Sequence, residues 1–188
     1  ISIELAGLKF DNVLQCGSGQ ATNTGEKIKR IAVEGAPGAI VTKSISVDMG
    51  MHWGRGSRIP SLACWPWTGR QADMDKKAGG KVCVISASRG EPSTCDEWLA
   101  QELPIALEGK VPVIGNAGGA ADMAQWLYLA KEFERAGCAM VELNFGTPHA
   151  HQWGHGAVLL FSGFAFDVVK MVKKSVDIPV VVKLPYLS

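Results

Sequence analysis

The chain has 188 residues, of which 47% are hydrophobic and 20% charged, and its net charge is +1. This is the composition of an ordinary globular domain, and the low charge without a basic run argues against a nucleic-acid-binding surface. No apolar stretch approaches the ~20 residues needed to span a membrane. Five scattered cysteines without a Cys-x-x-Cys pair favour free thiols in a reducing compartment, so we expect a cytoplasmic protein.

Short apolar runs and amphipathic segments alternate along the chain. Residues 2–10 predict a hairpin that turns at Ala6-Gly7. Strands are then predicted at 12–16, 38–42, 81–85, 111–116, 138–144 and 179–183. Helices are predicted from about residue 24, over 96–107 with an interruption at Pro104, and in two later segments. One of these carries Met123, Trp126, Leu127, Ala130 and Phe133 on one face and ends before Gly137; the other carries Phe164, Val168, Met171 and Val172.

Several of the predicted strands end in a polar residue. The clearest cases are Lys43, Asn144 and Lys183, each of which closes a run rich in β-branched residues. Alternating strands and helices form a parallel sheet, and the carboxyl ends of its strands meet at the edge where such proteins bind ligands. Two lysines and several amides at that edge predict a site for a polar, anionic ligand.

The order of elements favours the first part of a (β/α)8 TIM barrel with an N-terminal hairpin. A complete barrel needs eight strands and typically ~250 residues, so we expect this segment to belong to a longer polypeptide. A doubly wound open sheet is the alternative. Gly17-Ser18-Gly19 argues against it, because the Gly-x-Gly-x-x-Gly fingerprint is absent there and no acid follows at the right place. Residues 44–80 show no clear period, as expected of a long loop that covers a site.

Four motifs in order give the chain a resemblance to a known family. They are Glu4-Leu-Ala-Gly-Leu-Lys-Phe-Asp-Asn12, Gly38-Ala-Ile-Val-Thr-Lys-Ser44, Glu142-Leu-Asn144 with Pro148, and Asp177-Ile-Pro-Val-Val-Val-Lys-Leu184. From Ile3 to Pro185 the sequence resembles the FMN-dependent dihydroorotate dehydrogenases and the flavin barrel of dihydropyrimidine dehydrogenase. The resemblance implies that residues 1–188 are the N-terminal portion of a single FMN-binding (β/α)8 barrel.

The same resemblance implies the site residues. The expected FMN contacts are Ser18, Gly19, Lys43, Ser44, Asn116, Asn144 and Lys183. Lys43 would also take part in catalysis, and Asn144 would reach the substrate. A fixed ammonium group beside the flavin suits the charge that a reduced flavin acquires, and the Asn144 amide suits an imide-like ring edge.

The chain departs from the family pattern at the base. Thr147 stands where the family has its catalytic cysteine, and a threonine hydroxyl is a far weaker acid than a thiol. Some relatives use serine there, and His149 could assist the hydroxyl and contact the substrate. The expected reaction moves hydride between a cyclic amide and flavin at a CH–CH group. The stretch 86–92 matches the orotate loop poorly, and Pro148-His149 places the pattern nearer the dihydropyrimidine branch.

Two other functions remain open from the sequence. The first is a degenerate, non-catalytic or electron-relay barrel in a larger redox complex, motivated by Thr147 and Ala87. The second is a metal-dependent barrel hydrolase, motivated by His149, His151 and His155, although the loop supplies no acidic partners and we expect no metal. The expected partners are a small-molecule substrate and either a second copy of the chain or an electron-transfer subunit. Iron–sulfur clusters would belong to another domain or subunit. Trp53, Trp65 and Trp67 could stack on a flat ligand or simply pack beneath the long loop.

Overall fold

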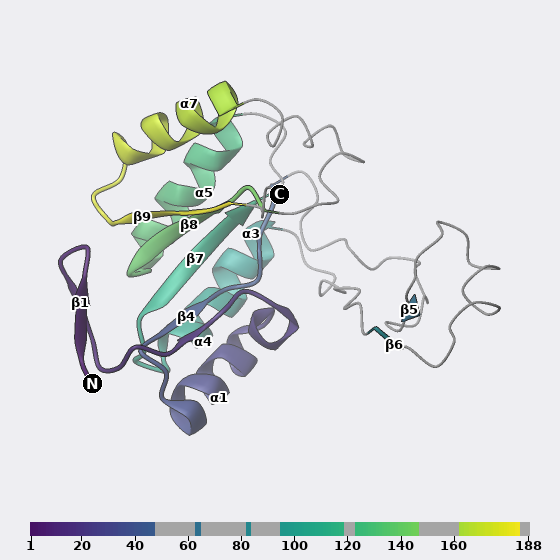
Figure 1. Cartoon of the computed structure of the whole chain (residues 1–188), viewed down its shortest axis with the longest axis vertical. Helices are drawn as coiled ribbons and strands as arrows, with labels where there is room; N and C mark the ends of the chain where they lie inside the picture. The colour runs from purple at the N-terminus through teal and green to yellow at the C-terminus, as the bar shows by residue number, and fades with distance from the viewer. Residues whose placement is uncertain (48–62, 65–81, 84–94, 119–122, 147–161, 185–188) are drawn as a thin grey trace.

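The centre of the fold is a five-stranded parallel sheet (Figure 1). The computed structural model describes residues 1–47, 63–64, 82–83, 95–118, 123–146 and 162–184. Chain order and spatial order are the same across the sheet, which consists of β3 (Gln15–Cys16), β4 (Ala39–Val41), β7 (Val113–Gly118), β8 (Met140–Asn144) and β9 (Val180–Lys183). Helices connect successive strands from β3 to β9. This arrangement is part of a (β/α)8 barrel, as predicted.

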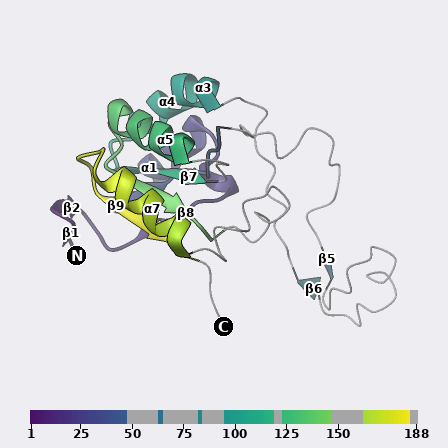
Figure 2. The same ribbon diagram turned by 90° about the horizontal axis from the view of Figure 1, so that it is seen from above.

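Helices pack on one face of the sheet. They are α1 (Gly25–Gly35), α3 (Cys95–Glu97), α4 (Leu103–Leu107), α5 (Met123–Ala136) and α7 (Ser162–Lys173). Figure 2 shows α4 and α5 together on one side of the strands. Their apolar side chains form the main core with every second strand residue, including Ile40, Val113, Ala117, Val141 and Leu143. The spacing of two follows from the alternation of side chains along a strand.

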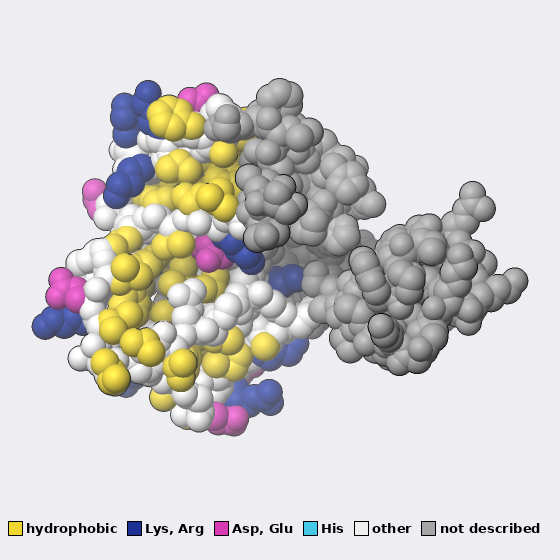
Figure 3. Space-filling view, viewed as in Figure 1, with side chains coloured by type: hydrophobic (Ala, Val, Ile, Leu, Met, Phe, Trp, Pro, Cys, Tyr) yellow, Lys and Arg dark blue, Asp and Glu magenta, His cyan; other side chains and the backbone are white. Residues whose placement is uncertain are grey.

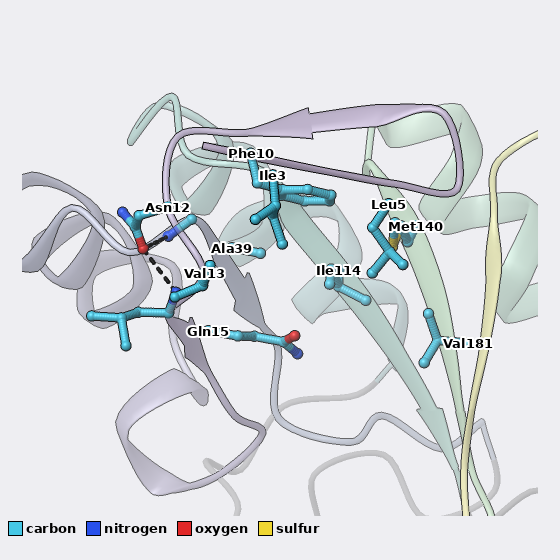
Figure 4. Close-up of a pocket in the computed structure, with 12 residues that line it drawn as sticks. Ile3, Leu5, Phe10, Asn12, Val13, Gln15, Ala39, Ile114, Met140 and Val181 are labelled. Atoms are coloured by element: carbon cyan, nitrogen blue, oxygen red, sulfur yellow. Dashed lines mark hydrogen bonds between the residues drawn. The ribbon is translucent and has the colours of Figure 1, made fainter. Parts of the chain in front are cut away.

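A hairpin lies across the amino-terminal end of the other sheet face. Its strands are β1 (Ile3–Leu5) and β2 (Leu8–Phe10), and the positive φ angles of Ala6 (52°) and Gly7 (79°) confirm the predicted turn. Phe10 packs with residues of β4, β7 and β8 in a second, smaller core, and an apolar pocket remains beneath the hairpin (Figure 4). Figure 3 shows hydrophobic side chains over this side of the sheet, with acidic and basic ones nearer the carboxyl ends of the strands. The inner face therefore changes from apolar to polar along the strands.

The prediction that 81–85 forms a strand of the barrel sheet is wrong. The structure has β6 (Val82–Cys83) in that range, and β6 pairs antiparallel with β5 (Ala63–Cys64) in a separate two-stranded sheet. In the parallel sheet β4 pairs directly with β7, with Ile40 opposite Val113, so no position is left between them. A short apolar run fixes the tendency to form a strand but not the strand with which it pairs.

The predicted helix over 96–107 is continuous, and its irregularity precedes the proline. A π-helical segment, η2 (Trp98–Glu102), joins α3 to α4, and the Leu103 N–H donates to the Trp98 oxygen five residues back. Pro104 has no N–H and would crowd the carbonyl four residues before it in a regular α-helix. A wider π turn at that point accommodates the proline.

The remaining helix predictions are confirmed with one change. Thr24 caps α1, because its side-chain oxygen accepts a hydrogen bond from the Lys27 N–H. Gly137 follows α5 with a φ of 95°. The buried face of α5 includes Leu129, while Leu127, the residue expected there, is only partly buried. No helix in the described part of the chain is both long and apolar enough to cross a membrane.

Candidate functional site

Four predicted site residues lie on the inner face of the sheet, at the carboxyl ends of four neighbouring strands. Asn116 follows Ile114 by two positions on β7, and Asn144 follows the inward Met140 by four on β8. Lys43 and Lys183 likewise come two residues after Val41 and Val181, which belong to the inner core. Residues two apart on a strand share a face, so all four polar side chains stand above the apolar inner layer.

Asn144 is positioned by contacts at both ends of its amide. Its Nδ2 donates to Ser44 Oγ at 2.7 Å, and its Oδ1 accepts from the Gly146 N–H at 3.0 Å. Gly118 lies opposite Asn144 in the sheet register, and Lys183 lies opposite it on the other side. A Cβ on Gly118 would stand 3.3 Å from Asn144 Cβ and 3.5 Å from Ser44 Cβ, so glycine allows the close approach of these two residues.

Asn116 is fully buried and only half of its side-chain amide is used. Its backbone N–H donates to Thr42 Oγ1 at 2.9 Å, and its backbone oxygen accepts from the Ile45 N–H at 2.9 Å. Its side-chain Nδ2 donates a short hydrogen bond to Glu142 Oε1 on the neighbouring strand. Among the described residues, no group donates a hydrogen bond to Asn116 Oδ1. A buried carbonyl oxygen of this kind is ready to accept a donor from a ligand.

The two lysines place positive charge at the same edge. Lys43 is partly buried, and its backbone N–H is anchored to the Thr22 oxygen at 2.8 Å. Burial lowers the pKa of Lys43 below its usual value of 10.5, and the positive charge of Lys183 lowers this pKa further. The two ammonium groups therefore repel one another, and an anionic group bound between them would relieve that repulsion.

Glu142 lies beneath these groups and was missed as a site residue in the sequence. It is 8% exposed, and burial raises the pKa of its carboxyl group. The charge of Lys183 and the hydrogen bond from Asn116 act in the opposite direction on that pKa. An acid within an apolar strand, two residues before Asn144 and hence on the same face, was the available signal.

Ser18 and Gly19 lie just after β3, beyond the carboxyl end of the strand next to β4. Ser18 is partly buried, and the Gly19 N–H donates to Thr22 Oγ1 at 3.1 Å. The Gly19 amide is therefore used within its own loop. A Cβ on Gly19 would meet nothing within 4 Å, so this glycine leaves open space beside the loop.

The remaining predicted site residues lie outside the described part of the chain. They are Thr147, His149, His151, His155 and the tryptophans Trp53, Trp65 and Trp67. Their roles stay predictions from the sequence. Within the described ranges, no group of three or more His, Cys, Asp or Glu residues could hold a metal ion.

Comparison with known proteins identifies relatives along almost the whole chain. No protein-family model matches it. It is 32% identical over 98% of its length to the catalytic subunit of dihydroorotate dehydrogenase B (NAD(+)) from Methanocaldococcus jannaschii. The corresponding subunits from Methanosarcina mazei and Pyrococcus furiosus are 32% and 29% identical over 96% and 98% of this chain. The chain spans about half the length of these relatives, covering 54%, 51% and 53% of them respectively.

Proposed function

We propose, from its similarity to catalytic subunits of dihydroorotate dehydrogenase B, that this chain forms part of an FMN-dependent oxidoreductase that moves hydride between a cyclic amide and flavin. In this proposal residues 1–188 are the N-terminal portion of one FMN-binding barrel. The observation that carries it is the convergence of Lys43, Lys183 and Asn116 at the carboxyl edge of the sheet, where Asn116 Oδ1 has no hydrogen-bond donor within the described ranges.

The residues at this edge fit FMN. When bound, FMN accepts hydride and gains negative charge near its N1–O2 edge. The ammonium groups of Lys43 and Lys183 would stabilise that charge, and the charge would in turn reduce their mutual repulsion. Asn116 Oδ1 would accept a ring N–H, which satisfies a buried oxygen without a donor in the described chain. Asn116 is held by its hydrogen bonds to Thr42 and Glu142, so its amide needs little reorganisation on binding.

The proposed proton transfer is carried by residues known only from the sequence. Oxidation of a dihydropyrimidine ring removes hydride from one carbon and a proton from the neighbouring carbon. We assign the proton to the Thr147 hydroxyl, which needs His149 or a water chain to accept it in turn. Asn144 would orient the ring, and its fixed contacts with Ser44 and Gly146 would hold it in place for that role.

Two observations bear on which dihydropyrimidine is the substrate, and they favour different compounds. The similar proteins are dihydroorotate dehydrogenases, and an extra carboxylate on the ring would suit an edge with two lysines. The 86–92 stretch and Pro148-His149 favour an uncharged dihydropyrimidine. Both substrates present ring N–H and carbonyl groups and undergo the same CH–CH oxidation.

An anaerobic reduction experiment tests this function. The full-length protein loaded with FMN is mixed separately with dihydroorotate and dihydrouracil while the flavin absorption is followed. We expect one of the two substrates to bleach the flavin in the wild type and not in Thr147→Ala, which should still bind FMN. A protein that binds no flavin, or whose flavin neither substrate reduces, would contradict the proposed function.

A further inference from the structure

Asn116 and Glu142 form a buried pair on adjacent strands of the inner face. The sheet register places Asn116 directly opposite Glu142, so the two side chains leave their strands side by side. Asn116 is 0% exposed and Glu142 is 8% exposed, and the Asn116 Nδ2 donates to Glu142 Oε1. Asn116 has no access to bulk water and Glu142 has little, so water is a poor substitute for this contact.

The Glu142 carboxylate determines which end of the Asn116 amide it meets. An ionised carboxylate only accepts hydrogen bonds, whereas an amide both donates and accepts. The opposite amide orientation would set the Asn116 carbonyl oxygen against a carboxylate oxygen, with two acceptors in contact. With Glu142 ionised, a form that the charge of Lys183 and the hydrogen bond from Asn116 favour, the pair fixes Nδ2 toward Glu142 and leaves Oδ1 as the end that a ligand can meet.

In the described part of the chain, that oxygen has no partner. Asn116 Oδ1 has no hydrogen-bond donor among the described residues. Lys43 and Lys183 lie on the same face of the sheet, at the ends of other strands, and neither donates to it. The Thr42 hydroxyl oxygen accepts from the Asn116 backbone N–H, and the hydroxyl makes no hydrogen bond to Oδ1. A fully buried acceptor without a donor is costly unless a bound molecule supplies one.

We propose that Glu142 is a positioning residue that makes Asn116 a dedicated acceptor, so that the site selects a ring bearing an N–H at that point. This inference rests on the proposed function and deepens it. The isoalloxazine of FMN and a dihydropyrimidine ring both carry such an N–H, flanked by carbonyl groups. The shared chemistry is a cyclic imide or amide N–H, and the two sources are separated by methylating each ring in turn.

The experiment compares each ligand with its N-methylated analogue. Dissociation constants of FMN and N3-methyl-FMN for the full-length apoprotein are measured by quenching of flavin fluorescence. In the second arm, dihydrouracil or dihydroorotate and their ring N-methylated forms are titrated into the FMN-loaded protein. For one of the two ligand pairs, flavin or dihydropyrimidine, the wild type should bind the N–H form at least about tenfold more tightly than the N-methylated form. This is the usual scale for one lost hydrogen bond to a buried acceptor.

Three variants isolate the role of Glu142. Glu142→Gln keeps the shape but can present either end of its own amide, so the preference for N–H should fall at least about threefold. Glu142→Leu removes the acceptor and should bring the preference close to one. Thr42→Val serves as the matched control, because it removes the contact to the Asn116 backbone and leaves the side-chain amide held by Glu142. Its preference should equal that of the wild type, even if both ligands bind more weakly.

The ratio separates positioning from general damage to the fold. A loosened barrel would weaken the parent ligand and its methylated form together, leaving their ratio unchanged. The inference is overturned if both Glu142 variants keep the wild-type ratio, or if the wild type discriminates in neither arm. Flavin binding without discrimination would overturn this inference alone, whereas a wild type that binds no flavin would overturn it together with the proposed function.

Discussion

Replacement of Lys43 is the sharpest perturbation of the proposed flavin site. Lys43→Met keeps most of the side-chain stem and removes the ammonium group, so the packing of the partly buried side chain changes little. We expect FMN to bind more weakly and its reduction potential to fall, because the positive charge favours the more negative, reduced form of the flavin.

The size of the effect follows from the environment of Lys43. A hydrogen bond to a charged group contributes about 1.5–3 kcal/mol. Burial and Lys183 already lower the pKa of Lys43, so its removal also relieves some unfavourable energy. We therefore expect a loss near the lower end of that range, which corresponds to roughly 10–30-fold weaker FMN binding. If about 1.4 kcal/mol of it acts on the reduced form alone, the two-electron potential falls by about 30 mV.

The assay measures the FMN dissociation constant by fluorescence quenching and the potential by anaerobic dye equilibration. Lys29→Met is the matched control, because Lys29 lies on α1 and forms an exposed ion pair with Glu108 at 2.7 Å, away from the inner face. It removes one positive charge and should leave both quantities unchanged. If Lys43→Met retained wild-type affinity and potential, the placement of flavin beside Lys43 would be refuted.

Three further predictions test the electrostatics, the packing and the base. Lys183→Gln should raise the pKa of Lys43 toward 10.5, which NMR titration would follow. In the wild type the free energy of unfolding should increase as pH rises from the folded pKa of Lys43 to its unfolded value, and in the variant this increase should be smaller. An unchanged pKa of Lys43 would contradict the coupling between the two lysines. Gly115→Ala should lower the free energy of unfolding in urea by about 1–3 kcal/mol, because its Cβ would lie 2.3 Å from the Phe133 ring, and Phe133→Leu should recover part of the loss. Thr147→Cys should raise the rate of flavin reduction by dihydropyrimidines and shift its pH profile to lower pH, since a thiol is the stronger acid; an unchanged profile would make Thr147 a wall of the pocket.

The sequence is sufficient to predict the parallel strands and the residues at their ends. β8 is buried at every position, and a short, mostly apolar run that ends in an amide is typical of a central strand. Parallel strands bring their carboxyl ends together whatever the intervening loops do. For that reason the amino-acid sequence alone groups Lys43, Asn116, Asn144 and Lys183 at one edge of the sheet.

Pairing partners and buried polar contacts are less accessible from the sequence. The run at 82–83 has the composition of a strand, but its pairing with 63–64 depends on the path of the chain between them. The role of Glu142 could not be predicted from the sequence, because nothing near it in the chain shows that its carboxylate accepts a hydrogen bond from the Asn116 amide on another strand. Its importance becomes visible only in the sheet register, which places the two residues opposite one another.

A structure of the full-length protein with FMN bound tests the proposed flavin site most directly. We expect the flavin ring at the carboxyl ends of β4, β7, β8 and β9, with its N1–O2 edge toward Lys43 and Lys183 and a hydrogen bond to Asn116 or Asn144. Flavin bound elsewhere, for example in the apolar pocket beneath the hairpin, with Lys43 and Lys183 left in contact only with solvent, would contradict it.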